Sequence, residues 1–388
     1  MAVITGADRI VENPALLEHK RWGIVTNYTG VTSSLELTAT ALHKAGAPLV
    51  AIFGPEHGTR GTAQAGFSEE SEADPETGLP VYDTYLKEGA ELDAIIAAAD
   101  VDVLVFDMQD LGVRFYTYVW TFVDCMRSAA RLGIDVVVLD RPNPLGGVKV
   151  EGPALDESGF SSFVGRVDVA TRHGLTVGEL LDMVARRDTA AGLPEANLRV
   201  IEMIGWDREM LWADTGLPWV MPSPNMPTPD SALAYVGTGL FEGTLMSEGR
   251  GTTRPFELIG APWVDSRYVE TLNALELPGV RFREAWFNPT FHKFAGEVVA
   301  GVQLHILDTN SFAPVATAVA MIDAAKELYP DGFAWRLPER SAESLSNTIP
   351  FIDLLWGSDS LRTTIDAGGR GGDLPLVTTH PRDAQLLY

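Results

Sequence analysis

Five short apolar runs, separated by segments with helical periodicity, restrict the first half of this chain to one kind of fold. We interpret the runs as β-strands: WGIVTN at 22–27, LVAIFG at 49–54, DVLVFD at 102–107, DVVVLD at 135–140 and LRVIEM at 198–203. Helices are expected between them, at 33–45, 91–99, 120–132 and 176–187. Apolar strands that alternate with helices are typical of a parallel sheet flanked by helices. The pattern therefore predicts a Rossmann-like α/β domain.

Three of the predicted strands end in loops that are rich in polar side chains. GPEHGTRG follows the second strand, MQDLGVRFYTY the third and RPNPLGG the fourth. In an open α/β sheet the ligand crevice lies beyond the carboxyl ends of the strands, where these loops meet. We therefore predict a site there, with candidates from the loops and the end of the first strand: Asn27, Glu56, His57, Arg60, Asp107, Gln109, Asp110, Arg114, Asp140, Arg141 and Asn143.

A structural interpretation of these side chains stays open. Asp107 and Asp140 fit equally well as helix caps or as buried ion-pair partners of Arg114 and Arg141. Such residues would hold the loops in place without reacting.

The usual ligand motifs of Rossmann-like domains are missing. The first predicted strand leads into TNYTGVTSS, which has one glycine where a dinucleotide site needs G-x-G-x-x-G. The P-loop pattern is also absent, and the seven histidines are scattered without an H-E-x-x-H motif. We expect a domain that binds no nucleotide, and a site with neither a cofactor nor a metal.

The charge of the chain limits its partners. It has 53 acidic against 29 basic residues and a formal charge of −24, which would repel nucleic acid and anionic membranes. No apolar stretch reaches the roughly 18 to 20 residues that span a bilayer, and the N-terminal residues lack the pattern of an export signal. We expect a cytoplasmic protein with no nucleic-acid or membrane partner. An anionic small substrate remains possible where arginines dominate the local potential.

The second half of the chain begins with a change in composition near residue 220. LPWVMPSPNMPTPDSALAY, at 217–235, is rich in proline and predicts an extended loop over the site or a crossing between domains. The charged, glycine-rich stretch at 237–257 follows, and it is either part of the site or a solvated interdomain loop. A strand at 298–306 and a helix at 314–329 then indicate a smaller α+β domain. We place the catalytic domain at 1–250 and the C-terminal domain, which completes the cleft, at 251–388.

Eight motifs in a fixed order give the chain a family resemblance. They are FGPEHGTRG, TGLPVYDTY, DVLVFDMQDLGVRFYTYVWT, LDRPNPLGG, RHGLTVGEL, PSPNMPTPDSALAYVGTGLFEGT, SEGRGTTRPFELIGAPW and FNPTFHKFAGEVVAGVQLHI. They resemble the motifs of bacterial exo-β-N-acetylmuramidases, the NamZ-type glycosidases, and they extend from about residue 20 to about residue 335.

The resemblance implies both a function and a catalytic residue. The implied reaction is release of N-acetylmuramic acid from the non-reducing end of peptidoglycan fragments, in the recycling of cell-wall material. The implied protein has two domains, the first Rossmann-like and without a nucleotide. The glutamate of the PEHG motif, which is Glu56 here, is implied to be catalytic.

The chemistry of glycosidic cleavage assigns roles to the candidates. An acid must protonate the leaving oxygen, and a second group must assist at the anomeric carbon. Glu56 is the candidate acid. Asp107, Asp110 and Glu248 are candidates for the second group, although a 2-acetamido sugar can also supply its own carbonyl oxygen.

Binding residues follow from the chemistry of muramic acid. Its lactyl ether carries a carboxylate, and an arginine can bind a carboxylate through two parallel hydrogen bonds. Arg114, Arg250 and Arg254 are the candidates for this contact. Tyr116 and Tyr118 alternate in RFYTY, so that one ring can stack on the sugar while the other packs inside.

Two functions of other classes remain open. The same crevice is compatible with a sugar- or muropeptide-binding protein that catalyses nothing, because a fold does not determine an activity. Another hydrolase, such as a phosphatase with Asp107 as its nucleophile, is disfavoured because no convincing metal ligand set is visible. The sequence does not indicate an oligomeric state.

Overall fold

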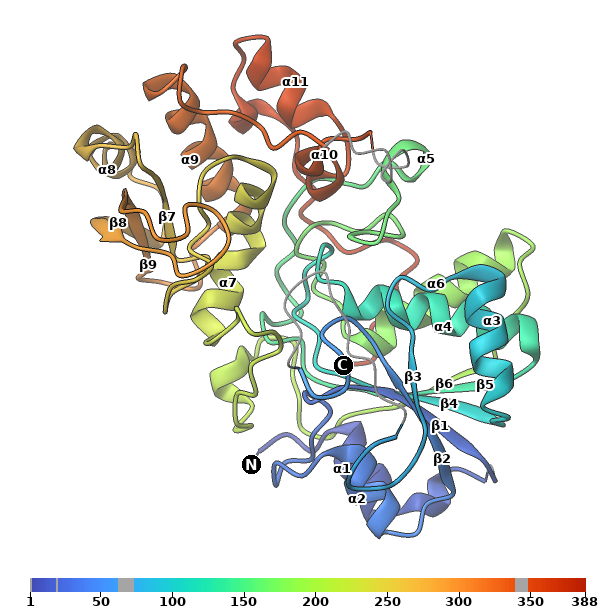
Figure 1. Cartoon of the computed structure of the whole chain (residues 1–388). Helices are drawn as coiled ribbons and strands as arrows, with labels where there is room; N and C mark the ends of the chain where they lie inside the picture. Colours follow the sequence, from blue (N-terminus) through green and yellow to red (C-terminus); the bar gives the residue numbers. More distant parts are fainter. Residues whose placement is uncertain (1, 19, 62–72, 339–347) are drawn as a thin grey trace.

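The computed structural model describes residues 2–18, 20–61, 73–338 and 348–388. The described residues form a larger α/β domain with a parallel sheet and a smaller second domain with an antiparallel sheet (Figure 1). The predicted fold class is confirmed.

The six-stranded sheet of the first domain has the order β3-β2-β1-β4-β5-β6, and all its neighbouring strands are parallel. Its strands are β1 (Trp22–Thr26), β2 (Leu49–Gly54), β3 (Val81–Asp83), β4 (Val103–Asp107), β5 (Asp135–Leu139) and β6 (Leu198–Ile201). Five of them lie where strands were predicted. The edge strand β3 was not predicted, because its three half-buried residues are too few to show a periodicity.

Helices cover both faces of this sheet, which explains why its strands are apolar throughout. Val103 and Val105 of β4 pack on the face of α1 (Gly6–Glu12) and α2 (Thr38–Lys44), whereas Leu104 and Phe106 face the opposite side. The helices on that side are α3 (Gly89–Ala98), α4 (Tyr118–Leu132) and α6 (Val177–Ala190) (Figure 1). Alternate side chains of one strand are therefore buried in two different cores.

The second domain is built on the antiparallel sheet β7-β9-β8, with β7 (Leu258–Ala261), β8 (Val280–Phe287) and β9 (Val299–Ile306). Gly260 and Gly301 pair directly, and a Cβ on Gly301 would lie 2.1 Å from the carbonyl oxygen of Ile259. The helices of this half are α7 (Pro229–Thr238), α8 (Ser266–Ala274), α9 (Pro314–Leu328), α10 (Phe351–Trp356) and α11 (Ser360–Asp366). The short elements of the chain are α5 (Glu157–Phe160), η1 (Pro14–Leu16), η2 (Trp212–Asp214), η3 (Gly239–Gly243) and η4 (Gly371–Asp373).

The boundary placed at residue 250 stays a proposal, and α7 and η3, which precede it, are described with the second domain because they pack against α9 and α10. The last residues of the chain return to the first domain, where the Tyr388 hydroxyl donates to Asp140 at 2.8 Å. In the described part of the chain, no helix is long and apolar enough to cross a membrane.

Candidate active site

A cavity of about 550 Å³ lies between the two domains, at the loops that follow β2 and β4. The first domain contributes Glu56, His57, Tyr85, Phe115, Tyr116, Thr117, Ser162, Phe163 and Val164. The proline-rich segment and the second half of the chain contribute Ser223, Asn225, Met226, Tyr235, Glu242, Arg250, Phe256, Phe291, His292, Arg336, Phe351, Leu354 and Leu355. The predicted convergence of loops is therefore present for two of the three loops.

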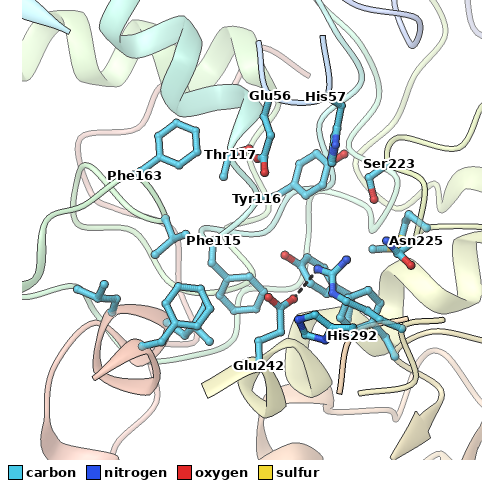
Figure 2. A pocket seen from close by; sticks show the side chains of 18 of the residues that line it. Glu56, His57, Phe115, Tyr116, Thr117, Phe163, Ser223, Asn225, Glu242 and His292 are labelled. Atoms are coloured by element: carbon cyan, nitrogen blue, oxygen red, sulfur yellow. Dashed lines mark hydrogen bonds and ion pairs between the residues drawn. The ribbon is translucent and has the colours of Figure 1, made fainter. Parts of the chain in front are cut away.

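Glu56 lies just beyond the end of β2 and points into the cavity (Figure 2). The next residue, His57, has a positive φ of 70°, so the chain turns sharply after the acid. Thr117, at the start of α4, donates its hydroxyl to Glu56 Oε2 at 2.6 Å and makes no side-chain capping bond with the helix. The carboxyl group is thus oriented by two elements of the sheet domain.

Glu242 reaches into the cavity from the opposite wall (Figure 2). It belongs to η3 and accepts a hydrogen bond from Arg250 at 2.9 Å. Two carboxyl groups from different domains therefore face one cavity. The sequence showed Glu242 only as one of several charges in a glycine-rich stretch, and it gave no reason to choose it over Glu248.

Glu248 lies behind this wall, in a buried ionic cluster. Its carboxylate is fully buried, 2.8 Å from Lys293 Nζ, 3.1 Å from His292 Nδ1 and 3.4 Å from Arg250 Nε. Burial alone would raise the pKa of Glu248, but Lys293, His292 and Arg250 hold this pKa well below its ordinary value. Glu248 is thereby kept charged, and it holds in place two residues that do line the cavity, Arg250 and His292.

Asp107 and Asp140 hold the sheet edge together. Asp107 is fully buried and accepts two hydrogen bonds from Arg141, at 2.6 and 2.9 Å. Asp140 accepts from the hydroxyl of Thr176 at 2.7 Å and from the backbone of Gly178 at 2.9 Å, so it supports the start of α6. Neither residue lines the cavity, and both have the structural roles that the sequence left open.

Asp110 is a buried acid whose Oδ1 has no hydrogen-bond partner in the described part of the chain. Its Oδ2 accepts from the backbone of Gly112 at 2.6 Å, and His173 Nε2 lies 3.9 Å from it. Burial raises the pKa of Asp110 to about 7, against the lowering effect of its backbone hydrogen bonds. Burial also lowers the pKa of His173 to about 3. Both side chains lie outside the cavity.

Four predicted polar residues support loops, and none of them lines the cavity. Gln109 donates to the carbonyls of Asp110 and Pro142, at 2.8 and 2.9 Å. Asn143 donates to the Leu175 carbonyl at 3.0 Å, and Asn27 accepts from the backbone of Thr29 at 2.9 Å. Arg60 pairs with Asp74 at 2.5 Å.

The three arginines predicted to bind the lactyl group lie in different places. Arg114 is fully buried and donates to the carbonyls of Pro153, Val169, Leu355 and Trp356, at 2.7 to 3.1 Å. The Arg254 side chain is 48% exposed, 3.4 Å from Glu257 and outside the cavity. Only Arg250 lines the cavity, where its guanidinium lies over the ring of Phe256.

The two tyrosines of RFYTY hold the proline-rich segment in place. The hydroxyls of Tyr116 and Tyr118 both donate to the Pro222 carbonyl, each at 2.7 Å. The Tyr116 ring lines the cavity, whereas Tyr118 is buried outside it. Their contact brings Ser223 and Asn225 to the cavity wall, two polar residues that the sequence did not assign to the site (Figure 2).

The cavity has a polar side and an apolar side. His57, Ser223, Asn225 and His292 lie on one side of the carboxyl groups, and Phe115 and Phe163 on the other (Figure 2). Sugars present both hydroxyl groups and apolar C–H faces, so such a cavity suits a carbohydrate. Within the described residues, no group of three or more His, Cys, Asp or Glu side chains could hold a metal ion.

The α/β fold, the two carboxyl groups that face one cavity and the polar and apolar sides of that cavity together suit a glycoside hydrolase. Comparison with known families gives the particular one. Residues 22–230 match the N-terminal part, and residues 233–375 the C-terminal part, of the exo-β-N-acetylmuramidase NamZ family. The chain belongs to this family, as its motifs indicated.

Individual relatives agree with this assignment. The chain is 44% identical over 369 residues to the peptidoglycan β-N-acetylmuramidase NamZ of Bacillus subtilis strain 168, covering 94% of this chain and 85% of that protein. Among solved structures, a DUF1343-family protein of Bacteroides fragilis NCTC 9343 matches with a TM-score of 0.83 and 36% identity, over 95% of this chain and 92% of that one. A second DUF1343-family protein of the same strain has a TM-score of 0.72 and 28% identity, over 96% and 92% of the two chains.

Proposed function

We propose that this glycoside hydrolase releases N-acetylmuramic acid from the non-reducing end of peptidoglycan fragments, acting as an exo-enzyme. The main support is that Glu56 and Glu242 face each other across one cavity, because glycosidic cleavage uses a pair of carboxyl groups. The family and the named activity of the Bacillus subtilis relative support this substrate. A place in cell-wall recycling and a cytoplasmic location stay predictions.

Glu56 is the proposed general acid. It would donate its proton to the glycosidic oxygen as the bond to the anomeric carbon breaks. The hydroxyl of Thr117, bound to Oε2, would keep the carboxyl group aimed at that oxygen. Thr117 is a positioning residue in this scheme.

Glu242 is the proposed second group, in place of Asp107, Asp110 and Glu248. It lines the cavity, whereas those three acids are buried in contacts with Arg141, Gly112 and Lys293. Arg250 donates a hydrogen bond to Glu242 at 2.9 Å, which orients its carboxyl group. Glu242 would assist at the anomeric carbon either directly or by orienting the 2-acetamido group of the substrate.

The remaining walls would bind the sugar. Ser223 and Asn225 offer hydrogen-bonding groups for hydroxyl or amide substituents, and the Tyr116 and Phe115 rings offer surfaces for its C–H faces. A binding protein without turnover would need the same walls but no pair of facing acids. The geometry therefore favours catalysis.

A substrate panel tests this function. The purified protein is incubated with an aryl β-N-acetylmuraminide, the matching β-N-acetylglucosaminide and an aryl phosphate, each with and without EDTA. We expect turnover of the muraminide, much less of the glucosaminide and none of the phosphate, with no effect of EDTA. Hydrolysis of the phosphate alone, or tight binding of muraminide without turnover, would contradict the proposal.

A further inference from the structure

Among the described residues, two arginines line the cavity, and they differ in how their charges are compensated. The Arg250 guanidinium lies 2.9 Å from Glu242 and 3.4 Å from Glu248, and its side chain is 12% exposed. A substrate carboxylate bound to Arg250 would be placed against two protein carboxylates. Like charges at such short separations repel strongly where water is largely excluded. The charge of Arg250 is therefore already paired with two protein carboxylates, which makes Arg250 poorly suited to bind a substrate carboxylate.

The other arginine, Arg336, has no ion-pair partner among the described residues. Its side chain is exposed at the cavity wall and makes no hydrogen bond or ion pair with any residue in the described part of the chain. Its backbone, however, is fixed, because Arg336 N donates to the Gly243 carbonyl at 2.8 Å. The neighbouring Leu245 N donates to the Ala334 carbonyl at 2.9 Å, which extends this short ribbon. A guanidinium without an ion-pair partner among the described residues is therefore anchored beside η3, the element that carries Glu242.

The electrostatics of the molecule require such a cation if the substrate is an anion. The chain has a formal charge of −24, and both facing residues in the cavity are acids. At about 0.15 M salt the Debye length is about 8 Å, so a charge inside the cavity mouth outweighs distant ones. An uncompensated guanidinium supplies that charge and offers paired donors that fit a carboxylate.

We propose that Arg336 binds the lactyl carboxylate of N-acetylmuramic acid and so determines the preference for muraminides over glucosaminides. This inference rests on the proposed function. The lactyl group is on the sugar carbon next to the one that carries the acetamido group. A substrate placed with its anomeric and acetamido side at Glu242 therefore presents its lactyl group near Gly243, where Arg336 is anchored.

The test compares Arg336→Ala and Arg336→Lys with the wild type on aryl muraminide and aryl glucosaminide with the same leaving group. A hydrogen-bonded contact to a charged group contributes about 1.5 to 3 kcal/mol, so Arg336→Ala should raise KM for the muraminide roughly 10- to 150-fold. The lysine variant should lose less, because it keeps the charge but not the paired donors. KM of each variant for the glucosaminide should stay within about twofold of the wild-type value, since that sugar has no lactyl carboxylate.

Arg370→Ala is the matched control. The substitution removes the same charge. The Arg370 side chain is 72% exposed, lies outside the cavity and has only a distant contact, at 3.8 Å, with the exposed Glu327. We expect the substitution to leave both substrates unchanged. Equal effects of Arg336→Ala and Arg370→Ala would show that only net charge matters, and would overturn the inference. An equal loss on both sugars in Arg336→Ala alone would overturn it too.

Equilibrium binding separates this inference from the proposed function. Calorimetry measures the affinity of each variant for N-acetylmuramic acid and for N-acetylglucosamine, without hydrolysis. If the wild type hydrolyses no muraminide but binds N-acetylmuramic acid through Arg336, the proposed function fails and the inference stands. If Arg336→Ala binds N-acetylmuramic acid as tightly as the wild type, the inference fails whatever the activity.

Discussion

The direction of the Glu56 carboxyl group is determined by the left-handed backbone conformation of the next residue, His57, and by the hydroxyl of Thr117. His57 and Gly58 both have positive φ, 70° and 73°, so the chain reverses directly after the acid. Thr117 then holds the carboxyl group from the start of α4. A non-glycine residue with positive φ is uncommon and costs free energy, which is typical of sites where a side chain must be aimed.

Asp110 gives a prediction at the same scale. Its folded pKa is about 7 and its ordinary value is 3.8, because burial disfavours the charged form. The stability that the neutral carboxyl contributes is complete below pH 3.8 and is lost as the pH rises through 7. Asp110→Asn should therefore gain stability over the wild type as the pH increases from 4 to 8, by on the order of a few kcal/mol. Denaturant unfolding at several pH values measures this difference, and parallel pH profiles of the two proteins would refute it.

Single residues of the site were only partly predictable from the sequence. Glu56 and Arg250 were selected and do reach the cavity. Arg114 was selected because it lies in the loop after a strand and because an arginine can bind a carboxylate, but its side chain donates to four backbone carbonyls. Position after a strand places a residue at the sheet edge. It does not decide whether the side chain enters the cavity or the core.

At the scale of elements, the proline-rich segment illustrates how a loop is fixed over a cavity. Tyr116 and Tyr118 both donate to the carbonyl of the buried residue Pro222, and Trp219 Nε1 donates to the Met226 carbonyl at 3.2 Å. The two tyrosine bonds attach the segment to the start of α4, and the Trp219 bond connects two residues within the segment. Ser223 and Asn225 depend on that attachment for their place in the cavity.

We expect the two tyrosine hydroxyls to act together. Tyr116→Phe or Tyr118→Phe alone leaves one donor on Pro222 and should cost less than about 1 kcal/mol. The double variant leaves a buried carbonyl without a donor, which costs about 1 to 3 kcal/mol, so its loss should exceed the sum of the single losses. Unfolding free energies and KM for the muraminide, measured for all three variants, check this. Purely additive effects would show that the tyrosines do not share this task.

Elements that are fully buried were easier to predict from the sequence than elements at the edge. Strand β4 was recognised because all five of its residues are buried, which makes its sequence uniformly apolar. The helix expected at 176–187 also begins where it was predicted, and Thr176 and Glu179 form a capping box at the start of α6. The short strand β3 lies at the sheet edge, and pairing with β2 rather than its own residues makes it a strand.

At the scale of the whole molecule, the site exists only because two domains meet. Glu56 and Glu242 are far apart in sequence and reach one cavity from different domains. The position of Arg336 depends on its backbone bond with Gly243, a contact between distant segments. Sequence periodicity reports local structure, so it predicted both domains but not the side chains that their contact brings together.

Arg114 connects the two halves of the molecule, and this gives a prediction. Its guanidinium donates to Pro153 and Val169 on one side and to Leu355 and Trp356 of α10 on the other. A lysine ammonium cannot span these carbonyls, so Arg114→Lys should lose at least about 3 kcal/mol of unfolding free energy. Arg370→Lys, an exposed exchange of the same kind, should lose less than about 0.5 kcal/mol. Substrate preference of folded Arg114→Lys should equal that of the wild type, and a changed preference would place Arg114 in substrate binding instead.

The most direct test of the account is the dependence of Glu56→Gln on the leaving group. The amide is nearly isosteric with the acid and can still accept from Thr117, but it has no proton to donate. On an unactivated disaccharide with N-acetylmuramic acid at its non-reducing end, we expect a loss of roughly 10²- to 10⁴-fold in kcat/KM. A dinitrophenyl muraminide needs little protonation of its leaving group, so the loss on it should be far smaller. Near-normal hydrolysis of the disaccharide by the folded variant, or an equal loss on both substrates, would contradict the role of Glu56 as the general acid.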